Sequence, residues 1–389
     1  MHAPDRTHNH AHTHTRRDFF VKFVKFTLVG AGLLELAHYR AAWFRAMAAT
    51  ADPQLFDIEK VAPGVFFARA RAQAYVNANA AIFVNSTDVL VVDSHSKPSA
   101  AASLIAQIKK EVTPNPVRYV VNSHFHYDHT QGNQAYRASE PKIDFIASEA
   151  TKQLMSDLAL QRLKASLDEV PQQLDELRAR AAKSTSAAEK AFCSEQIRQI
   201  EAYRQEMKNY TLELPTITFA TSHVIQDKAH DLHIEFHGHA HTAGDVVVFC
   251  PQKRAISSGD MIHGVMPFIG DGFPKAWPKT IDSVGALDFN RLMPGHGPLQ
   301  QNRQPMTGLR NYIEELTSKV DRGRTEGKTV ADLQKIVTFS SLKSLQSSGY
   351  AKYVADNENK VFPNFGPSAG LQDDINTNIA EIYANLDRL

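Results

Sequence analysis

The sequence is poor in cysteine and has no excess of charge of either sign. Its 389 residues include two cysteines, Cys193 and Cys250, which give no positive support for a disulfide. The 43 Lys and Arg residues nearly balance the 42 Asp and Glu residues, for a formal net charge of +1. Since no Lys- or Arg-rich stripe crosses the central region either, no nucleic-acid partner is expected.

Several motifs of other enzyme classes are also missing. The sequence has no Gly-x-Ser-x-Gly, which removes support for a serine nucleophile, and it has no Gly-rich phosphate loop or useful internal repeat. The apolar stretch at 23–37 contains Lys25 and Glu35 and is too short and too charged for a stable membrane span. With 43% hydrophobic and 22% charged residues, the composition is that of a globular protein with a substantial core.

Four metal-capable side chains fall within the six residues His124-Phe-His-Tyr-Asp-His129. They follow the apolar run 117–122, which predicts a buried strand that ends in a loop. Alternate side chains of an extended loop point the same way, so His124 and His126 can bind one ion. Asp128 and His129 suit a second ion. Imidazole and carboxylate without thiolate form a ligand set for zinc, and also for iron or manganese.

Three further ligand candidates follow, each where a predicted strand meets a loop, the usual place for site residues on a rigid scaffold. His241 precedes the apolar strand 246–250, Asp260 follows strand 255–259, and His296 lies in a Gly- and Pro-enclosed loop at 293–298. The predicted ligand sets are His124, His126 and His241 for one ion and Asp128, His129 and His296 for the other, with Asp260 as a bridge.

These motifs and their order resemble the metallo-β-lactamase-fold hydrolase superfamily. The matching pieces span roughly residues 55–300 and are Asp93 in Val91-Val-Asp-Ser-His95, the 124–129 segment, His241-Thr-x-Gly-Asp245, Gly259-Asp260 and Pro294-Gly-His-Gly297. The resemblance implies an α/β (α+β) fold, a four-layer αββα sandwich, with two metal ions at one edge of its sheets. Asp93 matches the family acid that orients a ligand imidazole. Asp260 looks like the glyoxalase II, lactonase and phosphodiesterase side of the family, because true zinc β-lactamases lack it.

The third ligand of the first ion has two candidates, His239 and His241. His241 is preferred because the Thr-Ala-Gly that follows it matches the family turn. His237 and His239 are then expected to support a ligand or to lie on a strand face.

The implied activity is hydrolysis of an ester-like bond of a small molecule (a lactone, a thioester or another acyl ester) by metal-bound hydroxide, with two Zn²⁺ as cofactors and iron or manganese as alternatives. Two metals can lower the pKa of a bound water toward about 7, and Asp128 and Asp260 can both bind metal and accept a proton. The alternative from a different class is an exported metal-binding accessory or maturation factor with little turnover. Lesser alternatives are a β-lactamase or a phosphodiesterase.

Residues 1–51 resemble a twin-arginine export signal. Arg16 and Arg17 precede the apolar stretch, and Ala49-Thr-Ala51 offers small residues for cleavage before Asp52. The prediction is a periplasmic protein, exported folded with its metal and without a stable membrane span after processing. The alternative is an amphipathic N-terminal helix that happens to begin with Arg-Arg. Alternating histidines at positions 8–14 are expected to bind metal only loosely.

The remaining chain divides into a metallo-β-lactamase-like domain at 52–302 and a helical C-terminal extension at 303–389. Strand–helix–strand order up to residue 121 supports a layered α/β body. A stretch rich in Ala, Leu, Glu, Lys and Arg at about 149–212 predicts two long helices that form an inserted hairpin. This hairpin is expected to pack on the body, or else to act as a lid or as an element that forms a homo-oligomer.

Overall fold

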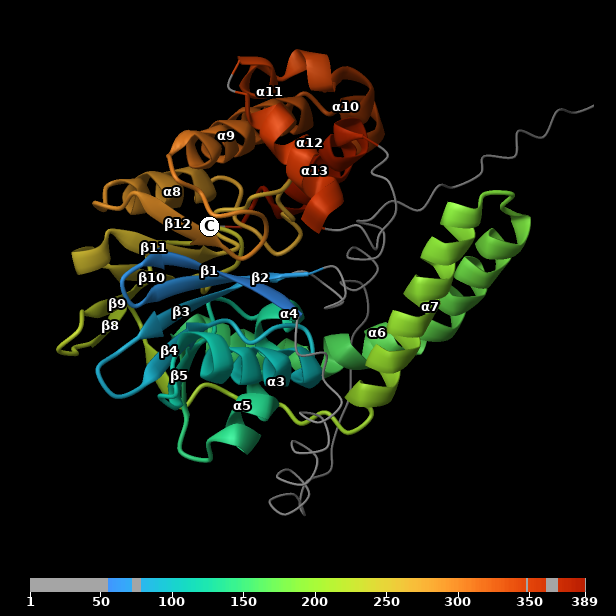
Figure 1. The fold of residues 1–389 in the computed structure, drawn as a ribbon. Helices are drawn as coiled ribbons and strands as arrows, with labels where there is room; N and C mark the ends of the chain where they lie inside the picture. Colours follow the sequence, from blue (N-terminus) through green and yellow to red (C-terminus); the bar gives the residue numbers. More distant parts are fainter. Residues whose placement is uncertain (1–54, 72–77, 348, 362–369, 389) are drawn as a thin grey trace, which may run out of the picture.

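The computed structural model describes residues 55–71, 78–347, 349–361 and 370–388 (Figure 1). The predicted export segment and its histidine tract lie outside the described residues. Two β-sheets face each other between layers of helices, which confirms the predicted sandwich. Within the described part of the chain, no helix has the length and apolar character needed to cross a membrane.

The first sheet contains seven strands in chain order. The antiparallel strands are β1 (Phe56–Ala62), β2 (Val65–Ala70), β3 (Ala80–Val84) and β4 (Val89–Val92). The sheet continues in parallel with β5 (Val117–Val121), β6 (Asp144–Ser148) and β7 (Ile217–Phe219). Because β4 and β5 are parallel, the loops that follow them leave the same edge of the sheet. Asp93 and the 124–129 segment are therefore brought together.

Parallel strands require crossover connections, and helices supply them here. The β4–β5 connection contains α3 (Pro98–Gln107) and the π-helical turn η2 (Ile108–Val112). The β5–β6 connection contains α4 (Tyr127–Thr130) and α5 (Asn133–Ser139). The β6–β7 connection is the predicted insertion, α6 (Glu149–Lys183) and α7 (Ala187–Met207).

The second sheet has five strands in the order β12-β11-β10-β9-β8. They are β8 (Ser222–Ile225), β9 (Leu232–Glu235), β10 (Val247–Cys250), β11 (Ala255–Gly259) and β12 (Arg291–Pro294), and a short helix η3 (Pro251–Lys253) joins β10 to β11. Only the β11–β12 pair in this sheet is parallel, with α8 (Trp277–Gly285) as its crossover. Asp260 and His296 consequently follow neighbouring strand ends.

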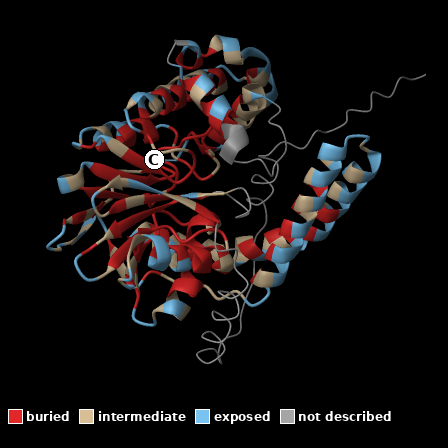
Figure 2. Ribbon diagram, viewed as in Figure 1, coloured by how far each residue is buried: buried red, intermediate tan, exposed pale blue. Residues whose placement is uncertain are grey.

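Three apolar layers hold the sandwich together (Figure 2). Strand β4 shows how: Val89 and Val91 pack against the helices outside the first sheet, whereas Leu90 and Val92 pack between the sheets. This division follows from the alternation of side chains along a strand. Because both faces of β4 are buried, the end of this strand is held in place. The loop that follows it, which contains Asp93, therefore has a fixed starting position.

The insertion is a helical hairpin that projects away from the sandwich (Figure 1). Ser148 accepts a hydrogen bond from Thr151 N and so caps α6, and Ser186 caps α7 in the same way. Pro171 lies inside α6 without ending it. The two helices share a small apolar core of their own, which consists of Leu163, Val170, Leu174, Ile200, Tyr203 and Met207.

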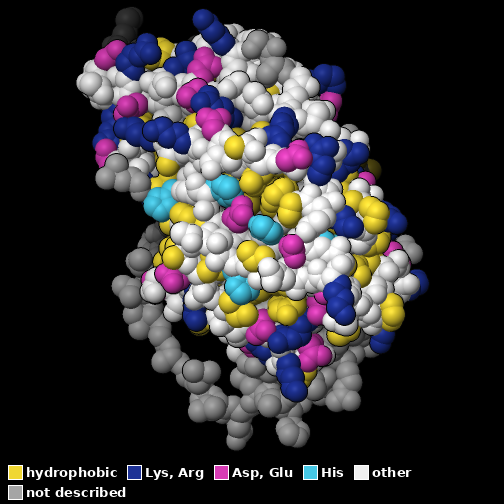
Figure 3. Space-filling model, turned by 90° about the vertical axis from the view of Figure 1, so that its left-hand side faces the viewer, with side chains coloured by type: hydrophobic (Ala, Val, Ile, Leu, Met, Phe, Trp, Pro, Cys, Tyr) yellow, Lys and Arg dark blue, Asp and Glu magenta, His cyan; other side chains and the backbone are white. Residues whose placement is uncertain are grey.

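The C-terminal region is helical, as predicted. Its elements are α9 (Gln304–Thr325), α10 (Val330–Ile336), η4 (Phe339–Ser341), α11 (Lys343–Ser347), α12 (Tyr350–Val361) and α13 (Leu371–Asn385). One face of α13 joins the same core as α8 and the outer face of the second sheet. Cys193 and Cys250 are both buried and free. On the face shown in Figure 3, basic and acidic side chains are interspersed.

Candidate metal centre

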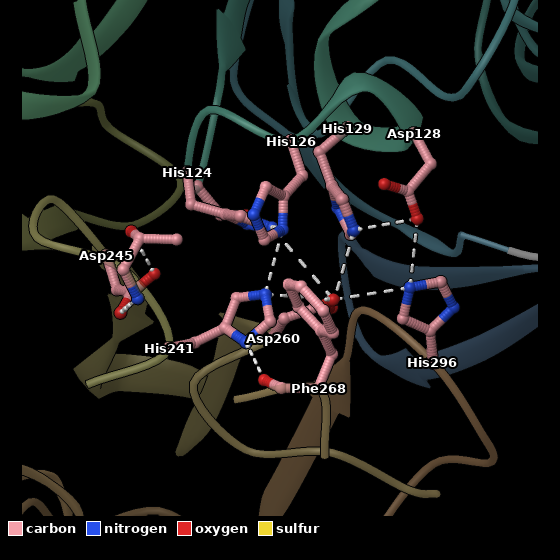
Figure 4. Close-up of polar contacts among 12 residues, drawn as sticks. His124, His126, Asp128, His129, His241, Asp245, Asp260, Phe268 and His296 are labelled. Carbon is pink, nitrogen blue, oxygen red and sulfur yellow. Dashed lines mark hydrogen bonds and ion pairs between the residues drawn. The ribbon is translucent and has the colours of Figure 1, made fainter. Parts of the chain in front are cut away.

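The seven predicted ligands meet at the edge of the sandwich where β5, β11 and β12 end (Figure 4). Their donor atoms form overlapping groups, and within each group all atoms lie within 4.8 Å of one another. One group is His124, His126 and His241, and another is Asp128, His129 and His296. We call these the first and the second metal position.

At the first metal position, three imidazole nitrogens converge. The Nδ1 atom of His126 lies 3.1 Å from Nε2 of His124 and 2.9 Å from Nε2 of His241. Nitrogens that bind one tetrahedral zinc at about 2.0–2.1 Å lie about 3.3 Å apart. The spacing is therefore close to that of three ligands to one ion.

In two of these three rings, the outer nitrogen contacts an oxygen atom that only accepts hydrogen bonds. His126 Nε2 lies 2.8 Å from Asp271 Oδ2, and His241 Nδ1 lies 3.0 Å from the carbonyl oxygen of Phe268. Carboxylate and carbonyl oxygens only accept hydrogen bonds, so in the neutral rings the proton sits on the outer nitrogen and the inner nitrogen presents its lone pair. Burial lowers the pKa of His124 and of His241 well below the ordinary value, which keeps both rings neutral.

The second metal position combines a carboxylate with two imidazoles. Asp128 Oδ2 lies 3.1 Å from His296 Nε2 and 3.4 Å from His129 Nε2. Asp93 Oδ2 accepts a hydrogen bond from His129 Nδ1 at 2.8 Å, so the Nε2 of His129 points into the site. Asp93 thus contacts a ligand imidazole in the manner that the resemblance implied.

Asp260 lies between the two positions. Its Oδ1 is 3.4 Å from His129 Nε2, and its Oδ2 is 3.3 Å from His296 Nε2 and 3.7 Å from His241 Nε2. One carboxylate therefore reaches ligands of both positions, as a bridge would. Gly295 makes room for it, because a Cβ atom on Gly295 would lie 2.1 Å from Asp260 Oδ1.

The charges at the second position depend on one another. Burial disfavours the imidazolium of His296, but the carboxylates of Asp260 and Asp128 outweigh this effect and raise its pKa to about 10. Burial also opposes ionisation of Asp128, yet His129 and His296 hold the pKa of this carboxyl well below its ordinary value. Two buried carboxylates therefore attract positive charge here, which either protons or metal cations can supply.

Two buried atoms are suited to a cation that takes up this position. Asp260 Oδ1 and His129 Nε2 make no hydrogen bond within the described residues although both are buried. Buried polar atoms of this kind usually have a partner. A metal ion between a carboxylate oxygen and an imidazole nitrogen would satisfy both, so the residues present fit a dinuclear centre of zinc, iron or manganese.

The turn after His241 is held by its own side chains. Asp245 accepts hydrogen bonds from Thr242 N at 2.8 Å and Thr242 Oγ1 at 2.7 Å. Burial raises the pKa of Asp245 to about 7. The sequence left His239 as an alternative ligand, but the ring of His239 packs on Phe273 with centroids 4.4 Å apart. The structure places His241, and not His239, beside His124 and His126.

Sequence reasoning missed three residues of the site. His263 is buried, its Nε2 lies 3.8 Å from Asp260 Oδ2, and it forms a further close group with His241 and Asp260. Its position three residues after Asp260 in the sequence could have identified it as a residue of the site. Asp271 and Arg162, which bonds to it, are 109 residues apart in the chain, and no local pattern links them.

Comparison with known proteins agrees with these observations. A family model described as the metallo-beta-lactamase superfamily matches residues 75–296. No curated protein sequence matches the chain. Similar solved structures include a metallo-beta-lactamase from Pontibacter korlensis, at 18% identity over 63% of this chain and 93% of that chain, with a TM-score of 0.46. Another is a metallo-beta-lactamase from Erythrobacter litoralis, at 16% identity over 67% of this chain and 97% of that chain, with a TM-score of 0.48. Since the family match covers more than half of the chain and spans all seven candidate ligands, the protein belongs to the metallo-beta-lactamase superfamily.

Proposed function

We propose that the protein is a dinuclear, zinc-dependent hydrolase of an ester-like bond in a small molecule, such as a lactone, a thioester or another acyl ester. The observation that carries this proposal is the position of Asp260, whose two oxygens lie within 3.4 Å of His129 Nε2 and 3.3 Å of His296 Nε2. A carboxylate in this place supports the resemblance to the glyoxalase II, lactonase and phosphodiesterase side of the family.

Two divalent ions, when bound, would acidify a water molecule and polarise the substrate's carbonyl oxygen. The chain's own residues have separate tasks. His124, His126 and His241 would hold the first ion, and Asp128, His129 and His296 would hold the second. Asp260 keeps the two positions at a fixed separation, and Asp128 and Asp260 are placed to accept a proton on its way to the leaving group.

Aromatic side chains border the first metal position. The ring of Phe268 is centred 5.8 Å from that of His126 and 6.1 Å from that of His241. Phe268 is partly exposed. A ring in this place favours an apolar acyl group next to the bond that is cleaved, which supports an acyl ester over a highly charged phosphate ester.

A substrate screen tests the proposal. Protein loaded with zinc, iron or manganese would be assayed on lactones, thioesters, other acyl esters, phosphodiesters and β-lactams, with Asp260→Ala as the inactive variant. His233→Ala, on strand β9 where the side chain is partly exposed, is the control for a substitution away from the candidate ligands. We expect metal-dependent turnover of one acyl-ester class, retained in His233→Ala and lost in Asp260→Ala.

Other outcomes would change the assignment. Preferred turnover of β-lactams or phosphodiesters would move the protein to that branch of the superfamily. Equal rates for wild type and Asp260→Ala on every substrate, with tight copurification of another protein, would favour a metal-binding accessory factor. Self-association through α6 and α7 stays a prediction, which the particle mass in solution tests.

We also propose that the protein acts in the periplasm after twin-arginine export. The support is the Arg16-Arg17 pair before an apolar stretch, together with a metal centre that forms only in the folded chain. Replacing both arginines with lysine should leave uncleaved protein in the cytoplasm, whereas wild type should begin near Asp52. Normal export of the double-lysine variant would contradict this route.

A further inference from the structure

One loop supports two of the three ligands at the first metal position. Within 267–271, the carbonyl oxygen of Phe268 accepts a hydrogen bond from His241 Nδ1 at 3.0 Å. The carboxylate of Asp271 lies 2.8 Å from His126 Nε2. We call residues 267–271 the support loop. Its position decides where the inner nitrogens of His126 and His241 point.

A side chain of the inserted hairpin reaches this loop. Arg162 of α6 makes two hydrogen bonds to Asp271, Nη1 to Oδ2 at 2.8 Å and Nη2 to Oδ1 at 2.9 Å. Its guanidinium also lies over the ring of Phe125, 4.9 Å from the ring centroid. Asp271 is 9% exposed. A bidentate pair in a buried setting fixes both the position and the rotation of the carboxylate.

Hydrogen bonds anchor the base of the hairpin to the sandwich. They fix the position of α6, the helix that carries Arg162. Ser148 and Thr151, at the start of α6, both donate hydrogen bonds to the carbonyl oxygen of Gly244, at 2.7 Å and 2.9 Å. Near the end of α7, Tyr203 donates to Gln131 Oε1 at 2.8 Å. Both ends of the insertion are thus tied to loops next to the metal ligands.

Helix α13 holds the support loop from the C-terminal region. Glu381 Oε2 accepts a hydrogen bond from Ile269 N at 2.8 Å. Asn385 Nδ2 donates to the carbonyl oxygens of Ile269 and Gly270, at 2.8 Å and 3.0 Å, and Asn378 Nδ2 donates to that of Pro267 at 3.1 Å. These contacts fix the backbone of the loop, whereas Arg162 fixes the side chain of Asp271.

We propose that Arg162 and Asp271 are positioning residues for the first metal position, and that the inserted hairpin is an integral part of the metal centre. The contact with Asp271 at 2.8 Å holds the N–H of His126 at Nε2, which leaves Nδ1 facing the first metal position. The two hydrogen bonds from Arg162 keep the carboxylate of Asp271 aligned for this contact. The inference rests on the proposed metal centre, and it adds that ion affinity at the first position depends on a residue of the insertion.

The test compares zinc binding by four variants of the full chain. Arg162→Ala and Asp271→Asn remove the two proposed partners. Arg162→Lys keeps the positive charge but cannot make the bidentate contact with Asp271. Lys164→Ala is the control, because Lys164 lies two residues along the same helix, is exposed and pairs only with Asp168 among its salt-bridge contacts within the described residues. Competition with a chelator gives both zinc affinities, and cobalt(II) absorption reports the geometry of each position.

We expect Arg162→Ala and Asp271→Asn to weaken one of the two zinc affinities about 10–100-fold, the usual effect of removing a partner of a ligand imidazole. The other affinity should stay at its wild-type value. Arg162→Lys should fall between wild type and Arg162→Ala, and Lys164→Ala should match wild type. The cobalt(II) spectrum should change only in the bands of the three-histidine position.

Two results would overturn the inference, and they are distinguishable from failure of the proposed function. Wild-type affinities in both Arg162→Ala and Asp271→Asn, with two ions bound, would refute the positioning role alone. Equal weakening of both positions in Asp271→Asn, with circular dichroism showing a loss of helix, would mean that the pair only stabilises the fold. A wild-type protein that binds no zinc at all would overturn the metal centre itself.

Discussion

The Nδ1 atom of His129 lies 2.8 Å from Asp93 Oδ2, and Asp93 itself has a left-handed backbone with φ of 69°. Such a backbone is uncommon outside glycine, although Asp and Asn tolerate it better than most residues. The same carboxylate accepts hydrogen bonds from Ser123 N and Ser123 Oγ, both at 2.8 Å. The loop after β4 therefore holds the loop after β5 in place.

Asp93→Asn should weaken metal binding at the second position about 10–100-fold. Asparagine tolerates the left-handed backbone conformation at this position, but its amide cannot accept all three hydrogen bonds that the carboxylate accepts. Chelator competition measures the change. Asp57→Asn, which alters a surface salt bridge with Arg71, is the control and should bind both ions normally. Two unchanged affinities in Asp93→Asn would contradict the role of Asp93 in orienting His129.

Metal analysis should approach two ions per chain, because seven ligands surround two positions. His296→Ala should reduce the value to about one, since His296 belongs only to the Asp128 and His129 group among the metal-binding groups of the described residues. Elemental analysis after zinc loading and removal of excess metal gives the number. A reproducible value of one in wild type would show that one position is wrongly assigned.

His241→Ala should abolish activity and empty the first position, whereas His239→Ala should have a much milder effect. His241 Nε2 lies 2.9 Å from His126 Nδ1, but the ring of His239 packs against Phe236 and Phe273. Metal content and turnover of the two variants, measured side by side, test this ranking. The reverse ranking would move the third ligand to His239.

Metal-free protein should lose stability as the pH rises from 7 to 10. The folded-state pKa of His296 is raised to about 10 from an ordinary 6.5. The contribution of protonated His296 to the stability of the folded protein is fully present below pH 6.5 and disappears as the pH approaches 10. His124 and His241, whose pKa values are lowered, cause the opposite loss below pH 6.5.

Thermal melts between pH 5 and 10, with a chelator and with zinc, measure this dependence. Zinc should flatten the alkaline decline, because the bound ion takes the place of the proton on His296. His296→Gln in the presence of chelator should also show a shallower decline. An increase in melting temperature of the chelated wild type between pH 7 and 10 would be inconsistent with this account.

The sequence predicted the seven candidate ligands, which the structure brings together, because each is a local signal, a metal-capable residue where an apolar strand ends. The hairpin and the C-terminal helices were predicted for a similar reason, since their periodicity extends over many residues. Short edge strands such as β8 carry little pattern, with two of four residues exposed, and they were missed. Arg162 was missed because its function depends on a contact with Asp271, 109 residues away, which only the folded chain creates.

The candidate metal ligands come from both sheets of the sandwich. His124, His126, Asp128 and His129 follow β5 in the first sheet, whereas Asp260 and His296 follow β11 and β12 in the second. Within the protein alone, Asn79 also joins the two sheets, because its Nδ2 donates to the carbonyl oxygens of Pro294 and Gly297. Bound ions would act as cross-links between the sheets. A ligand at 100 times its dissociation constant stabilises a folded protein by about 2.7 kcal/mol, so loss of metal would remove a stabilising link between the sheets at the same edge at which substrate is expected to bind.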